Sequence, residues 1–171
     1  MRRSSALLWA VLAACGGEPQ AASPPLEAIA EACTAEFCVR YPAGWEVEEQ
    51  DESLTFQHSE QPQAIASVSL INMQFLVEAN QGTWPSPVES VERDFWELQE
   101  EGTPDTRLEE LVPEPDGSVR SRGRVEGLVQ WHRLVPIGAG PGAVGVTVRA
   151  PDIGWEPHAR VFLEGVSLEE T

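Results

Sequence analysis

The sequence predicts an α+β domain in which an antiparallel β-sheet carries one capped central helix and a C-terminal helix packed on it. Three observations predict this class. Short segments of alternating apolar and polar residues, typical of half-buried strands, occur on both sides of one long amphipathic segment. A strong helix-start signal precedes that segment, and a shorter segment of helical spacing lies near the C-terminus. Counting these segments gives about seven or eight strands and two helices.

The first half of the chain predicts four strands, and a short helix over residues 26–32 comes before them. The strands alternate apolar side chains with glutamates, serines or other polar residues. The turn Pro42-Ala43-Gly44 separates the first two strands. The four expected strands are residues 37–41, 45–49, 53–58 and 64–73.

The central helix has the clearest boundaries. Ser86 is a suitable N-cap, Pro87 fits the first helical position, and Glu89 completes a capping box. Gly102 and Pro104 end the segment. Apolar side chains at helical spacing predict the face that packs on the sheet, namely Val88, Val91, Phe95 and Leu98.

The second half of the chain predicts four more strands and a closing helix. Asp116-Gly117 is a hairpin signal between the first two of these strands. The segment 128–135 is apolar at both parities, as expected of a central strand that is covered on both faces. Pro157 suits the first turn of a helix that ends near Glu164. The four expected strands are residues 107–112, 118–125, 128–135 and 143–150.

The stretch Val39-Arg40-Tyr41-Pro42-Ala43-Gly44-Trp45 is followed by short strands, a capped helix, a meander and a terminal helix that ends in Gly165-Val166-Ser167-Leu168. This arrangement resembles the PsbP-like fold, whose superfamily includes the DcrB-like and LpqN-like bacterial lipoproteins. The resemblance covers residues 37–168 and implies an αβα sandwich. Members share the fold and not a reaction, so the resemblance implies no catalytic residue and no cofactor.

The N-terminus has the pattern of an export signal. Met1-Arg2-Arg3 is basic, residues 6–14 are apolar, and Leu12-Ala13-Ala14-Cys15-Gly16 resembles the bacterial lipobox. The resemblance implies cleavage before Cys15 and attachment of a diacylglycerol and an acyl chain such as palmitate to that residue. The alternative is an ordinary secretory signal in which Cys15 falls at this position by chance.

The expected organisation is a lipoprotein signal peptide over residues 1–14, the lipidated cysteine and a flexible tether over 15–36, and the α+β domain over 37–171. The expected location is the cell envelope, where the N-terminal lipid holds the protein to the membrane. Gly16 replaces the aspartate of an inner-membrane retention signal. We therefore expect the outer membrane if the organism has one, and otherwise the outer face of the plasma membrane.

The two remaining cysteines are expected to form a disulfide. Export would bring Cys33 and Cys38 into an oxidising compartment. Four residues separate them, so a bond requires a turn or a helix-to-strand junction between them. Two reduced, buried thiols are the alternative.

The charge of the chain bears on its partners. Asp and Glu number 28 and Lys and Arg number 11, which gives a net charge of −17. Nucleic-acid binding needs a dense basic surface, so we expect no nucleic-acid partner. A partner protein of the envelope or a small ligand is expected instead, and the oligomeric state stays open.

One strand carries a basic cluster. Arg120, Arg122 and Arg124 alternate with small residues, so they share one face of that strand. They form a candidate site for an anion or an acidic peptide. The alternative, which we favour, is cross-strand pairing with carboxylates such as Glu109 and Glu110.

The candidate chemistry of the chain rests on its three histidines, His58, His132 and His158. None has the spacing of a metal-binding or nucleophile motif, so we predict no catalytic, metal-binding or cofactor-binding residue. The sequence favours a lipid-anchored envelope protein with a non-enzymatic binding or accessory domain of unknown ligand. The alternative is an envelope hydrolase or metal-dependent enzyme that uses one or more of these histidines.

Overall fold

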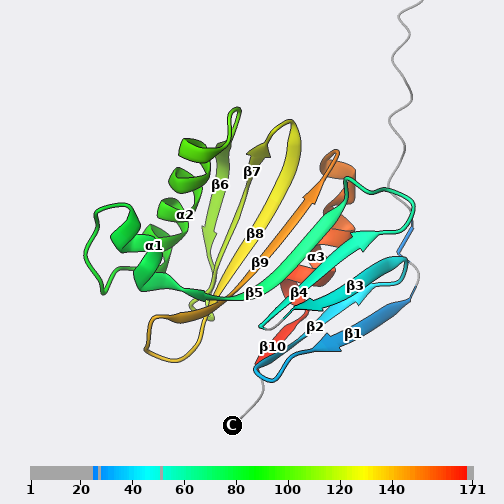
Figure 1. Ribbon diagram of the computed structural model, residues 1–171, viewed down its shortest axis with the longest axis horizontal. Helices are drawn as coiled ribbons and strands as arrows, with labels where there is room; N and C mark the ends of the chain where they lie inside the picture. Colours follow the sequence, from blue (N-terminus) through cyan, green and yellow to red (C-terminus); the bar gives the residue numbers. More distant parts are fainter. Residues whose placement is uncertain (1–24, 27, 51, 169–171) are drawn as a thin grey trace, which may run out of the picture.

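The computed structural model describes residues 25–26, 28–50 and 52–168, and within them the chain forms ten strands and three α-helices (Figure 1). The large antiparallel sheet has the strand order β3-β4-β5-β9-β8-β7-β6, and the small sheet has the order β1-β2-β10. The strands are β1 Ile29–Cys33, β2 Phe37–Pro42, β3 Trp45–Gln50, β4 Ser53–His58, β5 Ile65–Asn72, β6 Arg107–Pro113, β7 Val119–Val125, β8 Leu128–Pro136, β9 Gly142–Ala150 and β10 Val166–Leu168. The helices are α1 Met73–Ala79, α2 Val88–Gly102 and α3 Glu156–Glu164. No helix in this described part is long and apolar enough to cross a membrane.

Helices cover both faces of the large sheet and give the molecule three layers. On one face α2 packs across β6, β7 and β8. On the other face α3 and the small sheet pack together (Figure 1). The predicted fold class, an antiparallel sheet with the central and C-terminal helices packed on it, is confirmed.

The main core lies between the large sheet, α3 and the small sheet. Trp45, Phe56 and Phe162 are at most 5% exposed, and the Phe162 ring lies 4.9 and 5.0 Å from the other two ring centroids. Tyr41 packs 5.0 Å from Phe56. Gly44 turns the chain between β2 and β3 with φ +87°, a conformation that favours glycine. The Tyr-Pro-Ala-Gly-Trp motif is therefore a strand end, a turn and two core aromatics.

The central strand β8 is covered on both faces, as its apolar pattern predicts. Trp131 belongs to the main core on the α3 side. Leu134 packs in a second, smaller core with residues of α1 and α2. His132, of the same parity as Leu134, is 1% exposed and contacts α2.

Helix α2 forms where predicted, but its start and its packed face differ from the prediction. Pro87 keeps an extended backbone with ψ 141°, so the helix begins at Val88 and no side chain caps it. The buried side chains are Val91, Glu92 and Trp96. The predicted face was based on apolar residues alone and so left out Glu92, which is polar. It was therefore rotated toward Phe95, which is only partly buried.

Two other segments correct the sequence analysis. The short helix expected over residues 26–32 is wrong, because Ile29–Cys33 forms β1 and pairs with β2. The strand expected over 64–73 ends at Asn72, whose side chain accepts a hydrogen bond from the Phe75 amide and starts α1. The boundary expected between residues 36 and 37 falls inside the β1–β2 hairpin, so the folded domain includes β1.

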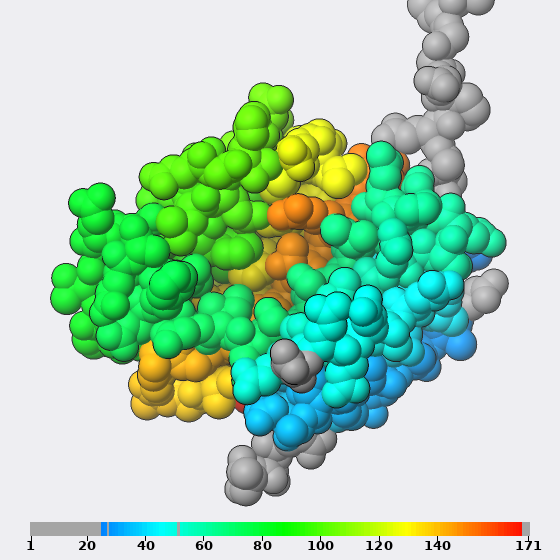
Figure 2. All heavy atoms as spheres, viewed as in Figure 1, coloured from blue at the N-terminus to red at the C-terminus, as the bar shows by residue number. Residues whose placement is uncertain are grey.

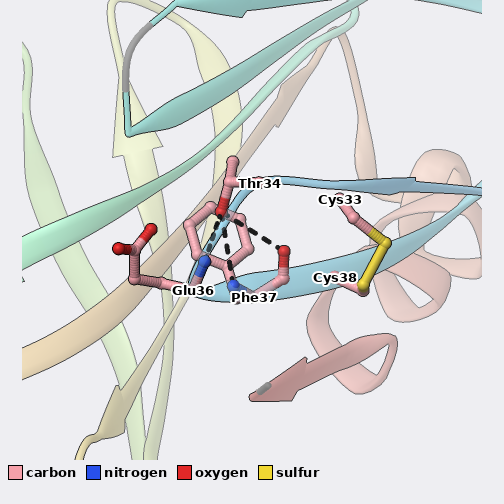
Figure 3. The surroundings of a disulfide bond; sticks show 5 residues. All are labelled: Cys33, Thr34, Glu36, Phe37 and Cys38. Carbon is pink, nitrogen blue, oxygen red and sulfur yellow. Dashed lines mark hydrogen bonds between the residues drawn. A yellow bond between two sulfur atoms is a disulfide. The ribbon is translucent and has the colours of Figure 1, made fainter. Parts of the chain in front are cut away.

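The expected disulfide joins Cys33 and Cys38, which face each other across this hairpin (Figure 3). The turn between them is held by Thr34, whose hydroxyl accepts from the amides of Glu36 and Phe37 at 3.3 Å. Antiparallel pairing thus supplies the turn that the bond requires. The predicted signal peptide over residues 1–14 and the predicted lipidation site Cys15 lie outside the described residues.

Candidate functional site

Two of the three histidines lie together in the main core. His58 ends β4 and His158 lies in α3, and their ring centroids are 6.1 Å apart. Both are at most 5% exposed and are packed among the rings of Trp45 and Trp155. Nδ1 of His58 accepts from the amides of residues 60 and 61 at 3.2 Å, and Nδ1 of His158 accepts from the Trp45 indole at 3.2 Å. Both rings therefore use Nδ1 as a hydrogen-bond acceptor within the core.

The environment of His58 favours its neutral form. Burial lowers the pKa of His58, and the nearby His158 ring lowers it further. Protonation at Nδ1 would also break the two hydrogen bonds from the amides. No group of three or more potential metal ligands occurs among the described residues.

The third histidine lies on the opposite face of the large sheet, in a polar cluster beneath α2. Nδ1 of His132 lies 2.8 Å from both carboxylate oxygens of Glu92. Ser121 donates its hydroxyl to the same carboxylate, and Trp96 donates its indole N–H to it at 3.2 Å and to Ser121 at 2.8 Å. The Phe95 ring stacks on His132 with centroids 4.1 Å apart.

This cluster has the residue types of a hydrolytic triad but not its geometry. A triad needs the serine hydroxyl on the histidine, whereas Ser121 and His132 both contact Glu92. All three side chains are at most 2% exposed, which leaves no access for a substrate. The cluster is a buried hydrogen-bond network that links α2 to strands β7 and β8.

The three arginines of the predicted basic cluster are each paired with a carboxylate. Arg122 lies 3.2 Å from Glu110, and Arg124 lies 3.3 Å from Glu109. Arg120 is bonded to Glu114 at the β6–β7 turn. The cross-strand pairing that we favoured is therefore present. Arg120 and Arg122 also line a small cavity, and Arg124 does not.

A groove opens on the face of the sheet that α2 leaves uncovered. It lies between α2 and strands β4, β5 and β9 and encloses about 500 Å³. Figure 2 shows this hollow between the green surface of α2 and the turquoise surface of β4 and β5, with orange atoms of β9 at its floor. We call it the sheet groove. Its lining residues are Thr55, Phe56, Gln57, Ile65, Ala66, Ser67, Phe95, Gln99, Thr147 and Arg149.

Strand register arranges the polar residues of the sheet groove in rows. Thr55 pairs with Ser67, and Ser67 pairs with Thr147, so three hydroxyls cross β4, β5 and β9 in line. The same row continues through His132 and Ser121 on β8 and β7, where α2 buries it. One half of a single polar row thus supports the helix, and the other half is the floor of the groove.

Arg149 lies at the end of the groove beside α2. Its Nε donates to Gln130 at 2.6 Å and its Nη2 donates to Gln99 at 3.0 Å. Burial lowers the pKa of the Arg149 guanidinium. The Nε2 atoms of Gln99 and Gln130 are buried without a hydrogen-bond partner among the described residues. The groove therefore ends in a fixed cation beside Gln99, whose Nε2 has no hydrogen-bond partner among the described residues.

The sheet groove was not among the features predicted from the sequence. Alternating hydroxyls at Ser67 and Ser69, and at Thr147 beside Arg149, were a signal that one strand face stays polar. Which of these residues share a row depends on the pairing of β4, β5 and β9. That pairing joins residues distant in the sequence, so the local pattern does not contain it.

A scan against protein-family models and a search of curated proteins find no match. Solved structures show the likeness instead. The Ran-binding protein Mog1p of Saccharomyces cerevisiae superposes with a TM-score of 0.60 at 12% identity, covering 82% of this chain and 95% of that one. The cyanobacterial PsbP (CyanoP) of Synechocystis superposes with a TM-score of 0.59 at 13% identity, covering 92% and 99%. The chain therefore has the sandwich fold of the PsbP and Mog1 proteins.

Proposed function

We propose that the protein is a lipid-anchored envelope lipoprotein whose domain is a non-enzymatic binding module, and that the sheet groove holds its ligand. The observation that carries this proposal is the half-covered polar row. Hydroxyls of Thr55, Ser67 and Thr147 stand on a rigid sheet beside the fixed guanidinium of Arg149. Preformed concave sites with a few fixed polar groups are typical of ligand binding.

The lining of the groove favours binding over catalysis. Arg149 is the only ionisable side chain among its lining residues, so no general base or nucleophilic carboxylate is present in it. Hydroxyl and amide groups can both donate and accept hydrogen bonds. This lining suits a segment of an envelope protein or a small polar ligand that presents a carbonyl or carboxylate oxygen to Arg149.

The membrane attachment rests on the sequence. The lipobox resemblance places lipid on Cys15, and 13 residues lie between it and the start of β1 at Ile29. A segment of this length reaches roughly 40 Å when extended, which is enough to hold the domain clear of the membrane surface. Several acyl chains give stable anchoring, whereas one gives only marginal binding.

Site-specific photocrosslinking tests the binding site. A photoreactive phenylalanine analogue replaces Thr55, an exposed residue of the groove, in the full chain expressed in a bacterial envelope. The matched control carries it at Phe75 of α1, which is 69% exposed and lies outside the groove. A discrete adduct that forms from position 55 and not from position 75 supports the proposal. No adduct, or the same adducts from both positions, contradicts it.

A separate experiment tests the anchor. The intact mass and the membrane partition of the wild type are compared with those of Cys15→Ser. A lipid mass increment and sedimentation with membranes, both lost in the variant, are expected. Two unmodified, freely released proteins would refute the lipoprotein assignment and leave the groove proposal standing.

A further inference from the structure

A second cavity lies on the opposite face of the large sheet, where α3 leaves β6 and β7 uncovered. It encloses about 150 Å³ between α3 and these strands. Arg120 and Arg122 of β7 and Arg160 of α3 line it, together with Trp131 of β8. We call it the arginine cavity. It shares no lining residue with the sheet groove, so the two sites can be tested independently.

Two buried donors of the arginine cavity have no acceptor within the described part of the chain. Trp131 is 3% exposed, and its Nε1 has no hydrogen-bond partner among the described residues. Nε of Arg122 is buried and also has no partner there. Buried N–H groups are rarely left unpaired, because each loses its hydrogen bonds to water. Two such groups lining one cavity point to an acceptor that occupies it.

Ion pairs hold the guanidinium groups of the cavity in place. Arg122 pairs with Glu110 at 3.2 Å, and Arg160 pairs with Glu156 at 3.2 Å. Both glutamates line the cavity as well. The lining contains three arginines and these two glutamates. Two more carboxylates lie beside the arginines, because Arg120 is bonded to Glu114 and Glu164 lies 3.8 Å from Arg120.

We propose that the arginine cavity binds one small monoanionic carboxylate. Its two oxygens would accept the hydrogen bonds that Nε1 of Trp131 and Nε of Arg122 lack. A carboxylate matches the planar donor geometry of a guanidinium. A cavity of about 150 Å³ can hold a molecule of about the size of benzene, so a short organic acid fits in it. A dianion would meet Glu110 and Glu156 with excess negative charge and is disfavoured.

The indole resonance of Trp131 reports on the site. Full-length protein labelled with nitrogen-15 is titrated with sodium acetate, and Trp131→Phe identifies the resonance among those of the six tryptophans. A saturating shift of this resonance with acetate is expected. Sodium chloride at equal ionic strength should produce no saturating shift, and neither should inorganic phosphate.

The basic cluster contains its own matched control. Arg122→Gln should weaken acetate binding at least tenfold, because it removes a charged donor from the site. Arg124→Gln removes an arginine of the same strand that does not line the cavity, and should leave the affinity unchanged.

Several results would overturn the proposal. They are the absence of a saturating shift in the wild type, an equal response to chloride, tighter binding of phosphate than of acetate, and equal weakening by the two arginine variants. The wild-type titration decides the first three even if a variant folds poorly.

Discussion

Replacing Glu92 by leucine would remove the acceptor that joins α2 to the sheet while keeping a side chain of similar size. Glu92 is fully buried, and its carboxylate accepts from Ser121, Trp96 and His132. Trp96 would keep Ser121 as a partner at 2.8 Å, so its donor is not orphaned. His132 would lose both contacts of its Nδ1, and its Nε2 is already without a partner among the described residues.

The expected loss of stability follows from the hydrogen bonds that Glu92→Leu removes. The substitution leaves two buried groups, the Ser121 hydroxyl and Nδ1 of His132, without their acceptor, and each such group costs about 1–3 kcal/mol of the free energy of unfolding. Glu92→Gln keeps one acceptor oxygen and should cost less, about 1–2 kcal/mol. Urea unfolding followed by circular dichroism measures the free energy of unfolding for both variants. Glu100→Gln, on the exposed side of the same helix, is the control and should stay within about 0.5 kcal/mol of wild type. A loss below about 1 kcal/mol for Glu92→Leu would refute the role assigned to the cluster.

Three further predictions concern the rest of the fold. Burial and the neighbouring His158 lower the pKa of His58 in the folded state below its value of 6.5 when unfolded. The unfolded chain therefore binds more protons below pH 6.5, so stability is full above that pH and falls as the pH drops toward the folded pKa. Unfolding curves between pH 8 and about pH 5 should show this slope, and His58→Asn should flatten it; an equal slope in the variant would contradict the assignment. Cys33→Ser opens the hairpin disulfide and should cost about 2 kcal/mol, measured by urea unfolding, and an unchanged midpoint would argue against the bond. Gly123→Ala would place a methyl group against the Arg107 carbonyl oxygen of β6 and 2.7 Å from the Trp96 ring, and it should lower the melting temperature with a cost of about 1–3 kcal/mol. An unchanged value would mean that β6 and α2 are not packed around Gly123 as described.

The sequence predicted the elements whose signal is local. The β6–β7 hairpin forms at Asp116-Gly117, with the Gly117 amide donating to the Glu114 carbonyl. The two-sided apolar pattern of β8 correctly predicts a strand covered on both faces. Helix α3 begins at Glu156, so Pro157 lies in its first turn as expected. In each case neighbouring residues alone determine the conformation.

The predictions were wrong where the structure of a segment depends on contacts with residues that are distant in the sequence. The segment that forms β1 is short and apolar at mixed spacing, and only its pairing with β2 makes it a strand. Glu92 reads as an exposed helix residue unless Ser121 and His132 are known to lie beneath it. For the same reason the pairing of Arg122 with Glu110 was predictable from a hairpin turn, whereas the row of Thr55, Ser67 and Thr147 was not.

The two proposed sites follow from one mismatch between the sheet and its helices. Adjacent strands lie about 4.8 Å apart, so a helix about 10 Å wide covers roughly two or three of them. The large sheet has seven strands. Helix α2 covers β6, β7 and β8 on one face, and α3 reaches β8 and β9 on the other. Because the helices are offset, the uncovered strands are β4, β5 and β9 beside α2 and β6 and β7 beside α3, where the sheet groove and the arginine cavity lie. Hydroxyls and arginines at these positions keep the open faces polar, while β7 and β9 bury valines on their covered faces. A third helix on either face would close one of these sites and would require apolar residues in place of the polar row.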